Sequence, residues 1–143
     1  MAYKYFSHNG EVLPVEQAVV PLSRIEYSYG FGVYETIRVV KGKAHFVDEH
    51  TARLMKSAQT IELEHKFAPD RIAISIDKLI AKNKIDSCNL KILLIGGPSS
   101  AEATLDIICL NPLFPDRKLY RDGIKCVTYK YERQFPGLLE AMG

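Results

Sequence analysis

The period of the apolar residues changes along this chain from that of a strand to that of a helix and back again. Residues 33–40 are rich in β-branched side chains, which favour a strand. Lys41-Gly42-Lys43 then predicts a turn into a second strand over residues 44–47. Earlier, Asn9-Gly10 between two short strand-type runs is typical of a tight hairpin. The N-terminal part of the chain therefore predicts antiparallel strands joined by short turns.

Two helices are predicted in the middle of the chain. Asp48 offers an N-cap for the first, with Glu49 in the first turn, where a carboxylate suits the helix dipole. The second is expected to begin at Pro69, because proline is favoured in the first turn of a helix. Each has an apolar face at helical spacing, formed by Leu54, Met55, Ala58 and Ile61 in the first and by Ile72, Ile76, Leu79 and Ile80 in the second.

Strand-type runs return after the second helix. Residues 91–95 and 104–110 are predicted as buried strands joined by the loop Gly96-Gly97-Pro98-Ser99-Ser100. Gly123 precedes a last predicted strand over residues 124–131. Hairpins with two helices inserted between them predict an α+β fold, in which an antiparallel sheet is covered on one face by two helices.

The composition argues against several classes of function. The chain has 143 residues, enough for one domain with its own core, and 19 basic against 17 acidic residues give a net charge of +2. A charge so evenly balanced gives no reason to expect nucleic acid or an anionic membrane as a partner. No apolar segment has the length of a secretory signal or of a membrane span. We therefore expect a cytoplasmic protein.

Neither the cysteines nor the histidines show a spacing typical of a metal site. Cys88, Cys109 and Cys126 form no C-x-x-C pair, and their odd number argues against a disulfide framework. Cys109 and Cys126 lie in apolar runs, where buried free thiols are expected. We predict no metal site, because metal-ligand spacing is also lacking among His8, His45, His50 and His65.

Two short segments carry a family resemblance. The family pattern of the first runs Asp-Arg-Gly and then Tyr-Gly-Asp-Gly-Val-Phe/Tyr-Glu-Thr, of which this chain keeps Arg24, Tyr29, Gly30, Gly32, Val33, Tyr34, Glu35 and Thr36. The second, His-x-x-Arg-Leu, is present on the first predicted helix as His50, Arg53 and Leu54. Together they resemble the N-terminal domain of the fold-type IV pyridoxal-phosphate enzymes, which include branched-chain aminotransferases, D-amino acid aminotransferases and aminodeoxychorismate lyases. That domain has the α+β architecture predicted above.

The resemblance implies roles for particular residues. Arg53 would bind the phosphate of pyridoxal phosphate, which suits a guanidinium because it presents forked donors and stays charged. Tyr34 would line the substrate side of the pocket, where its hydroxyl can meet a carboxylate, and an aromatic core position is the equal alternative. His50, three residues before Arg53 on the same helical face, is expected to brace the strand or the helix start. For Arg38 we expect a structural pair with Glu35 or another sheet residue.

The chain also departs from the family pattern. Phe31 stands where aspartate is usual, and Ile25 stands where glycine is usual. D-amino acid aminotransferases carry an Arg-Gly-x-x-x-Arg-x-His segment at a place that here is residues 95–101, which contain neither arginine nor histidine. The loss of this carboxylate-binding segment argues against a D-amino acid substrate, and leaves the branched-chain and lyase branches open.

The C-terminal segment contains no candidate for the lysine that these enzymes use to hold the cofactor as a Schiff base. In the family that lysine follows soon after the position of Arg133, where this chain has Leu139 and Glu140, and neither can form an imine. Lys130, the nearest amine, lies upstream in a strand-type pattern and is interpreted as a surface residue. We therefore predict that the chain contains no catalytic residue.

Two hypotheses follow for the function. In the first, residues 1–137 are the N-terminal domain of a class IV aminotransferase or lyase, residues 138–143 are an unmatched tail, and the C-terminal domain that carries the lysine is absent. Alone, such a chain should bind pyridoxal phosphate weakly and catalyse no turnover. In the second, the chain is a non-catalytic module that oligomerises or binds a small phosphorylated ligand. The intact relative would act on an amino acid or a similar small molecule, and a homodimer or a higher oligomer is expected under either hypothesis.

Overall fold

Six strands form one antiparallel sheet in the spatial order β2-β1-β6-β5-β3-β4. The structure is a computed structural model that describes residues 3–112, 114–128 and 130. The longest ladder joins β3 to β5, from Gly32 opposite Ile95 to Val40 opposite Ser87. The strands are β1 (Tyr5–His8), β2 (Glu11–Pro14), β3 (Gly32–Val40), β4 (Lys43–Ala44), β5 (Ser87–Ile95) and β6 (Thr104–Leu110).

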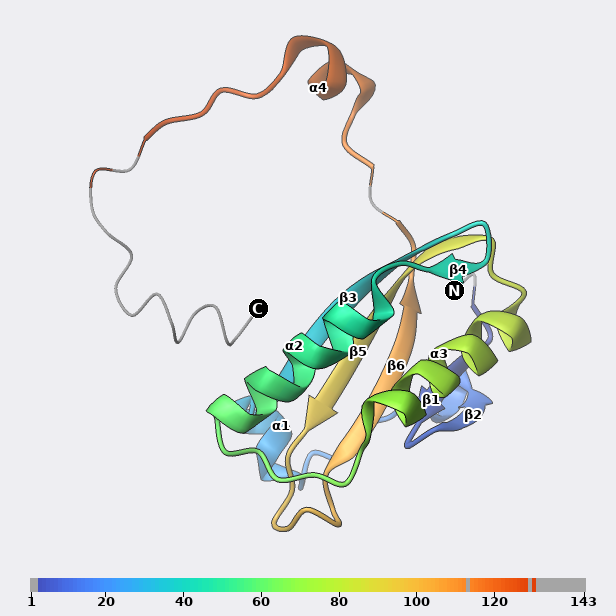
Figure 1. Cartoon of the computed structure of the whole chain (residues 1–143), viewed down its shortest axis with the longest axis vertical. Helices are drawn as coiled ribbons and strands as arrows, with labels where there is room; N and C mark the ends of the chain where they lie inside the picture. Colours follow the sequence, from blue (N-terminus) through green and yellow to red (C-terminus); the bar gives the residue numbers. More distant parts are fainter. Residues whose placement is uncertain (1–2, 113, 129, 131–143) are drawn as a thin grey trace.

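Two long helices cover one face of this sheet (Figure 1). α2 (Val47–Thr60) packs on β3, and α3 (Pro69–Asn83) packs on β1 and against α2. These are the two predicted helices, so the α+β prediction is confirmed. Three shorter helical segments were not predicted: the 3-10 turn η1 (Val15–Gln17), α1 (Ile25–Tyr29) and α4 (Arg117–Asp122). Within the described part of the chain, no helix is long and apolar enough to cross a membrane.

The hydrophobic core lies between the sheet and the two long helices. Alternate residues of β3 and β5 point into it, so burial alternates along both strands. The predicted apolar faces of the helices are buried there, with no exposed surface for Leu54, Ala58, Ile72, Ile76 and Leu79. Removing this apolar surface from water is the main source of the stability of the fold. The packed side chains also hold α2 in a fixed position over β3.

The Asn9-Gly10 hairpin is present as predicted. Asn9 and Gly10 have φ angles of 53° and 89°, and this left-handed backbone suits a two-residue turn between twisted strands. Asn9 also joins the hairpin to β6, because its backbone N–H donates to the Leu105 carbonyl at 2.8 Å and its Oδ1 accepts from the Leu105 N–H at 2.9 Å. At the start of β1, the Tyr5 N–H donates to Oδ1 of Asn83, which holds the strand to the end of α3.

Two details predicted around the first helix are wrong. The strand expected over residues 44–47 is reduced to the two residues of β4, which pair only with the end of β3. Val47 already belongs to α2, whose N-cap is Phe46 rather than Asp48. The reason is that the Phe46 carbonyl accepts the N–H of His50 at 3.0 Å, so the helix has begun before Asp48.

The last predicted strand is not formed in its described part. Residues 124–128 have no regular secondary structure, while residues 129 and 131 lie outside the described residues. An apolar run forms a strand only where a neighbouring strand takes its hydrogen bonds, and no described strand lies beside this one. Cys126 is consequently exposed rather than buried as predicted, and Cys109 is half-buried in β6.

Gly32 begins β3 at a place where the neighbouring strand leaves no room for a side chain. A Cβ at Gly32 would lie 2.8 Å from the Leu94 carbonyl oxygen and 2.6 Å from Cδ1 of Ile95. We expect Gly32→Ala to lower the free energy of unfolding by about 1–3 kcal/mol, because the backbone of β5 must shift to admit the methyl group. Urea denaturation measures this, with Ser28→Ala at an exposed position of α1 as the control. An unchanged midpoint for Gly32→Ala would show that β5 yields without cost.

Candidate functional site

The Glu35 carboxylate joins both polar residues of the helix motif. Alternation along β3 points Glu35 towards α2, where its side chain is only 2% exposed. Arg53 of α2 donates from Nε to Oε1 at 2.5 Å and from Nη2 to Oε2 at 2.6 Å, which is a bidentate pair. His50, one turn earlier, makes a hydrogen bond of 2.7 Å between its Nδ1 and Oε2, and so contacts the strand as expected. We call these three residues the Glu35 cluster.

The cluster keeps a buried carboxylate ionised. Burial alone would raise the pKa of the Glu35 carboxyl, but the hydrogen bonds from Arg53 and His50 together outweigh it, so the pKa lies below its ordinary value. The same pair raises the pKa of the Arg53 guanidinium. Because Oε2 is an acceptor, His50 must place an N–H on Nδ1. At neutral pH the pair is therefore a carboxylate and a guanidinium.

Arg53 is half-exposed and uses only part of its guanidinium to bind Glu35. Its side chain is 55% exposed, although Nε and Nη2 both donate to the buried carboxylate. The remaining edge, formed by Nη1 and the second N–H of Nη2, has no acceptor among the described residues. Two parallel N–H donors on a permanently charged group suit a phosphate. The geometry of Arg53 therefore fits the phosphate of pyridoxal phosphate.

Tyr34 lies on the opposite face of the sheet, which α2 and α3 leave uncovered. It is 46% exposed, so it does not occupy the core position that was the alternative for it. The Lys91 Nζ of β5 lies 4.8 Å from the centre of its ring, and we call these two residues the Tyr34–Lys91 pair. Sequence reasoning missed Lys91. The available signal was alternation, because Lys91 is opposite Thr36 in the ladder and so shares the face of Tyr34.

Arg53 and Tyr34 flank one edge of the sheet and do not share a face. β4 pairs with β3 only at Val39 and Val40, so no described strand pairs with the outer side of β3 before these residues. The Glu35 cluster lies on the helix side of this edge, and the Tyr34–Lys91 pair lies on the uncovered side. A ligand along the edge would face a guanidinium on one side and a phenol and an ammonium group on the other.

Arg38 pairs with sheet residues other than Glu35. Its Nη1 donates to Oδ1 of Asn89 at 3.2 Å, and its Nη2 donates to Oγ of Ser87 at 3.3 Å. The guanidinium carbon also lies 5.2 Å from the centre of the Phe114 ring. These contacts link β3 to β5 and to the segment after β6, which supports the structural role expected for Arg38.

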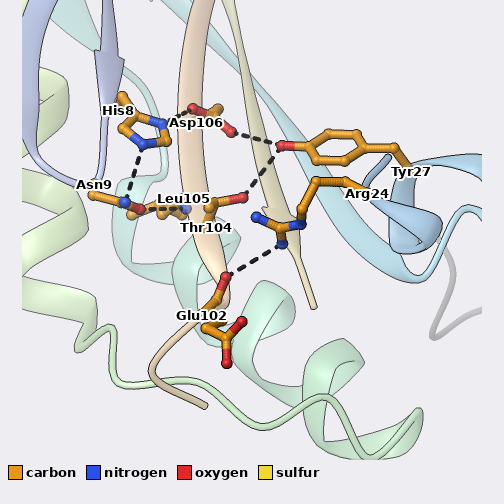
Figure 2. A network of polar contacts seen from close by, with 8 residues as sticks. All are labelled: His8, Asn9, Arg24, Tyr27, Glu102, Thr104, Leu105 and Asp106. Atoms are coloured by element: carbon orange, nitrogen blue, oxygen red, sulfur yellow. Dashed lines mark hydrogen bonds and ion pairs between the residues drawn. The ribbon is translucent and has the colours of Figure 1, made fainter. Parts of the chain in front are cut away.

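A second polar network lies around β1 and β6 (Figure 2). The His8 Nδ1 is 2.7 Å from Oδ1 of Asp106, and its Nε2 is 3.2 Å from Nδ2 of Asn9. Because Oδ1 of Asn9 accepts from Leu105, the amide nitrogen donates to His8 Nε2, and the His8 proton is on Nδ1. Both ring nitrogens are thus engaged, so His8 joins the hairpin to β6 and is not placed to abstract a proton.

Arg24, which the sequence shares with the family motif, also has a structural place in this network. Its Nη2 donates to the carbonyls of Gly96 at 3.0 Å and Glu102 at 3.3 Å, and so ties the segment before β3 to the loop between β5 and β6. Beside it, a cavity of about 490 Å³ lies between the sheet and residues 17–21. Across the described residues, no group of three or more His, Cys, Asp or Glu side chains could hold a metal ion.

The Glu35 cluster makes the stability of the fold depend on pH in the acid range. Because the folded pKa of Glu35 is lowered, its stabilising contribution is complete above the unfolded pKa and is lost as the pH falls through the folded value. We expect wild type to lose stability relative to Glu35→Gln below about pH 4. Urea denaturation of both proteins from neutral pH to about pH 3 measures this. A stability difference that is constant over this range would contradict the expectation.

Proteins similar to this chain are found by sequence. The family model described as amino-transferase class IV matches residues 32–141. A probable branched-chain-amino-acid aminotransferase of Rickettsia bellii (strain RML369-C) is 34% identical over 141 residues, which cover 94% of this chain and 48% of the relative. A D-alanine aminotransferase of Listeria monocytogenes serotype 4b (strain F2365) is 32% identical over 89 residues, which cover 62% of this chain and 31% of the relative. This chain therefore spans about a third to a half of the length of these relatives.

Solved structures share the fold. The branched-chain amino acid aminotransferase from Escherichia coli has a TM-score of 0.69 and 23% identity, and the match covers 77% of this chain and 41% of that one. The branched-chain amino acid aminotransferase from Thermobaculum terrenum, in its PLP-bound holo form, has a TM-score of 0.66 and 20% identity, over 82% of this chain and 42% of that one. At these identities the likeness concerns the fold alone, and it confirms the predicted architecture.

Proposed function

Because this chain belongs to the class IV aminotransferases, we propose that its described domain supplies the phosphate-binding and substrate-facing side of a pyridoxal-phosphate site. The observation that supports this most is the half-exposed Arg53 side chain, whose Nη1–Nη2 edge has no acceptor among the described residues. Pyridoxal phosphate, when bound, supplies the electron sink for amino-group transfer or elimination. The residues of this chain would bind the cofactor phosphate and orient the substrate.

Two groups on opposite sides of the β3 edge would bind the two ligands: Arg53 on the helix side and the Tyr34–Lys91 pair on the other side. Arg53 would hold the phosphate with its second pair of N–H groups. On the uncovered face, the ammonium group of Lys91 and the hydroxyl of Tyr34 would bind the carboxylate of the substrate. An amino acid carries such a carboxylate, so an amino acid or a similar molecule is the proposed substrate.

We propose that the amine which holds the cofactor covalently is not one of the lysines of this sequence. All of them lie in the described part of the chain, and none there makes a hydrogen bond or an ion pair with the Glu35 cluster. Lys91 is held over the Tyr34 ring on the other face, and Lys130 is exposed. The predicted substitution of the lysine by Leu139 or Glu140 lies outside the described residues. Alone, the chain is expected to bind pyridoxal phosphate weakly and to catalyse no turnover.

The choice of substrate rests on the sequence of the loop after β5. Relatives named as branched-chain and as D-alanine aminotransferases both match this chain. Residues 95–101 contain no arginine or histidine, which supports a branched-chain or lyase activity over one on D-amino acids. The alternative of a non-catalytic module has no support from the comparisons.

A homodimer is the proposed assembly. A single stretch before β3 exposes many large apolar side chains, a surface that a partner chain would cover. These are Val19, Val20, Leu22, Ile25 and Tyr29. Sedimentation equilibrium would test the assembly. The cytoplasmic location stays a prediction, for which the three free cysteines are the support.

The experiment that tests the proposed function combines spectroscopy with mass measurement. The purified chain is mixed with pyridoxal phosphate, its absorbance is recorded before and after borohydride reduction, and its intact mass is then determined. We expect saturable binding and no stoichiometric adduct on one lysine. A single reduced adduct mapped to Lys130 or Lys91 would overturn the claim about the amine, and no binding at all would overturn the phosphate role.

A further inference from the structure

We infer that Glu35 is a positioning residue for the proposed phosphate site, because it determines which edge of the Arg53 guanidinium faces the anion. This inference rests on the proposed function. The Glu35 carboxylate is buried and would not itself contact the cofactor. It should nevertheless raise the affinity for the phosphate.

The geometry of the pair carries the inference. A guanidinium has five N–H groups in one plane, and Glu35 accepts two of them, from Nε and from Nη2. Rotation about the end of the Arg53 side chain would break both hydrogen bonds. The two N–H groups that remain parallel, on Nη1 and Nη2, are therefore held pointing away from the sheet, where the side chain is exposed.

Glu35 is itself held in place by its strand, by burial and by His50. It lies in the middle of the longest ladder of the sheet, opposite Ile92. Its side chain is 2% exposed, and the hydrogen bond of 2.7 Å from His50 holds Oε2 from the direction of α2. A half-exposed arginine without such an anchor would sample several rotamers and would lose that freedom on binding. The anchor removes this cost before the anion arrives.

The negative charge of Glu35 permits the opposite interpretation, in which the carboxylate competes with phosphate for Arg53. Competition requires that both anions use the same N–H groups. Glu35 accepts only from the Nε–Nη2 edge and lies on the sheet beneath Arg53, so a phosphate at the Nη1–Nη2 edge need not displace it. The two interpretations predict opposite signs, since removing a competitor strengthens binding and removing an anchor weakens it.

The first test titrates the full chain with pyridoxamine 5′-phosphate, a probe with no aldehyde to react with surface lysines. We expect Glu35→Gln to weaken binding about tenfold, as is typical when the partner that orients a ligating side chain is lost. Glu26→Gln is the matched control, because Glu26 is also a buried carboxylate that pairs with an arginine, Arg24. Unchanged or tighter binding by Glu35→Gln would overturn the inference.

The second test separates positioning from a general loss of structure. In an Arg53→Ala background, Glu35→Gln should have no further effect on binding, whereas a merely structural role would weaken binding in both backgrounds. We expect Arg53→Lys to keep the fold even if Glu35→Gln does not, because lysine keeps a positive charge beside the buried Glu35 carboxylate. Arg53→Lys should bind pyridoxamine 5′-phosphate as poorly as Arg53→Ala. An ammonium group lacks the planar edges with which a guanidinium donates to a carboxylate and to a phosphate at once.

The outcomes for the inference and for the proposed function are distinguishable. Wild-type binding that is lost in Arg53→Ala but kept in Arg53→Lys and in Glu35→Gln would leave the phosphate site standing and overturn the positioning role. Wild-type chain that binds pyridoxamine 5′-phosphate no better than pyridoxamine would overturn both. Binding weakened in Glu35→Gln, unchanged in Glu26→Gln and non-additive with Arg53→Ala would establish the role of Glu35.

Discussion

Arg53→Ala is expected to weaken the binding of pyridoxamine 5′-phosphate by about 10–100-fold, because hydrogen bonds between charged groups contribute about 1.5–3 kcal/mol. The binding of pyridoxamine, which has no phosphate, should not change. Isothermal titration of the 143-residue chain with both compounds measures the difference. The prediction follows from the half-exposed Arg53 side chain, whose Nη1–Nη2 edge has no acceptor among the described residues.

Arg121→Ala is the matched control for this experiment. Arg121 lies on α4, is 74% exposed and also pairs with a carboxylate, that of Asp122. It should bind the probe as wild type does. Arg53→Ala leaves Glu35 buried without its main partner, so its stability must be measured in parallel by urea denaturation. Phosphate-dependent binding that survives in a folded Arg53→Ala variant would place the anion elsewhere.

Ile76→Ala is expected to lower the free energy of unfolding by about 2–5 kcal/mol, which is a large part of the stability of a domain this size. Ile76 lies in the middle of α3, has no exposed surface and belongs to the core between the helices and the sheet. Truncation removes apolar contacts and leaves a cavity that the packed neighbours fill only in part. Urea denaturation followed by circular dichroism measures the loss.

The same helix offers the control for Ile76→Ala. Ile74 is two residues away on the other side of α3 and is 49% exposed. Ile74→Ala makes the same chemical change without a cavity, so we expect its effect to be within about 1 kcal/mol of zero. Equal losses for the two variants would mean that α3 does not pack on the sheet by the face containing Ile76.

Local patterns were enough to predict most of the fold. The Asn9-Gly10 turn, the strand over residues 33–40 and the start of α3 at Pro69 depend on neighbours in sequence, and each is present. The strand predicted over residues 124–131 is absent from its described part, because that prediction also used only neighbours in sequence. Its residues are of strand-forming types, but a strand also needs a neighbour to pair with, and local sequence does not say whether one is there.

The candidate site was predictable only in part. The motif indicated Arg53, but the partner of Arg53 lies 18 residues away on another element, and helical spacing could not reveal it. Nor could the motif show that Arg53 and Tyr34 flank the β3 edge from different faces. Lys91 looked like an ordinary charge in a strand, and only the ladder register places it beside Tyr34. Contacts between elements were therefore the part that required a structure.

The most direct measurement is a crystal structure of the chain with pyridoxamine 5′-phosphate. We predict that the phosphate lies within hydrogen-bond distance of Nη1 of Arg53, while Nε and Nη2 remain on Glu35. A phosphate bound at another place, or one that displaces Glu35 from Arg53, would contradict the proposed site.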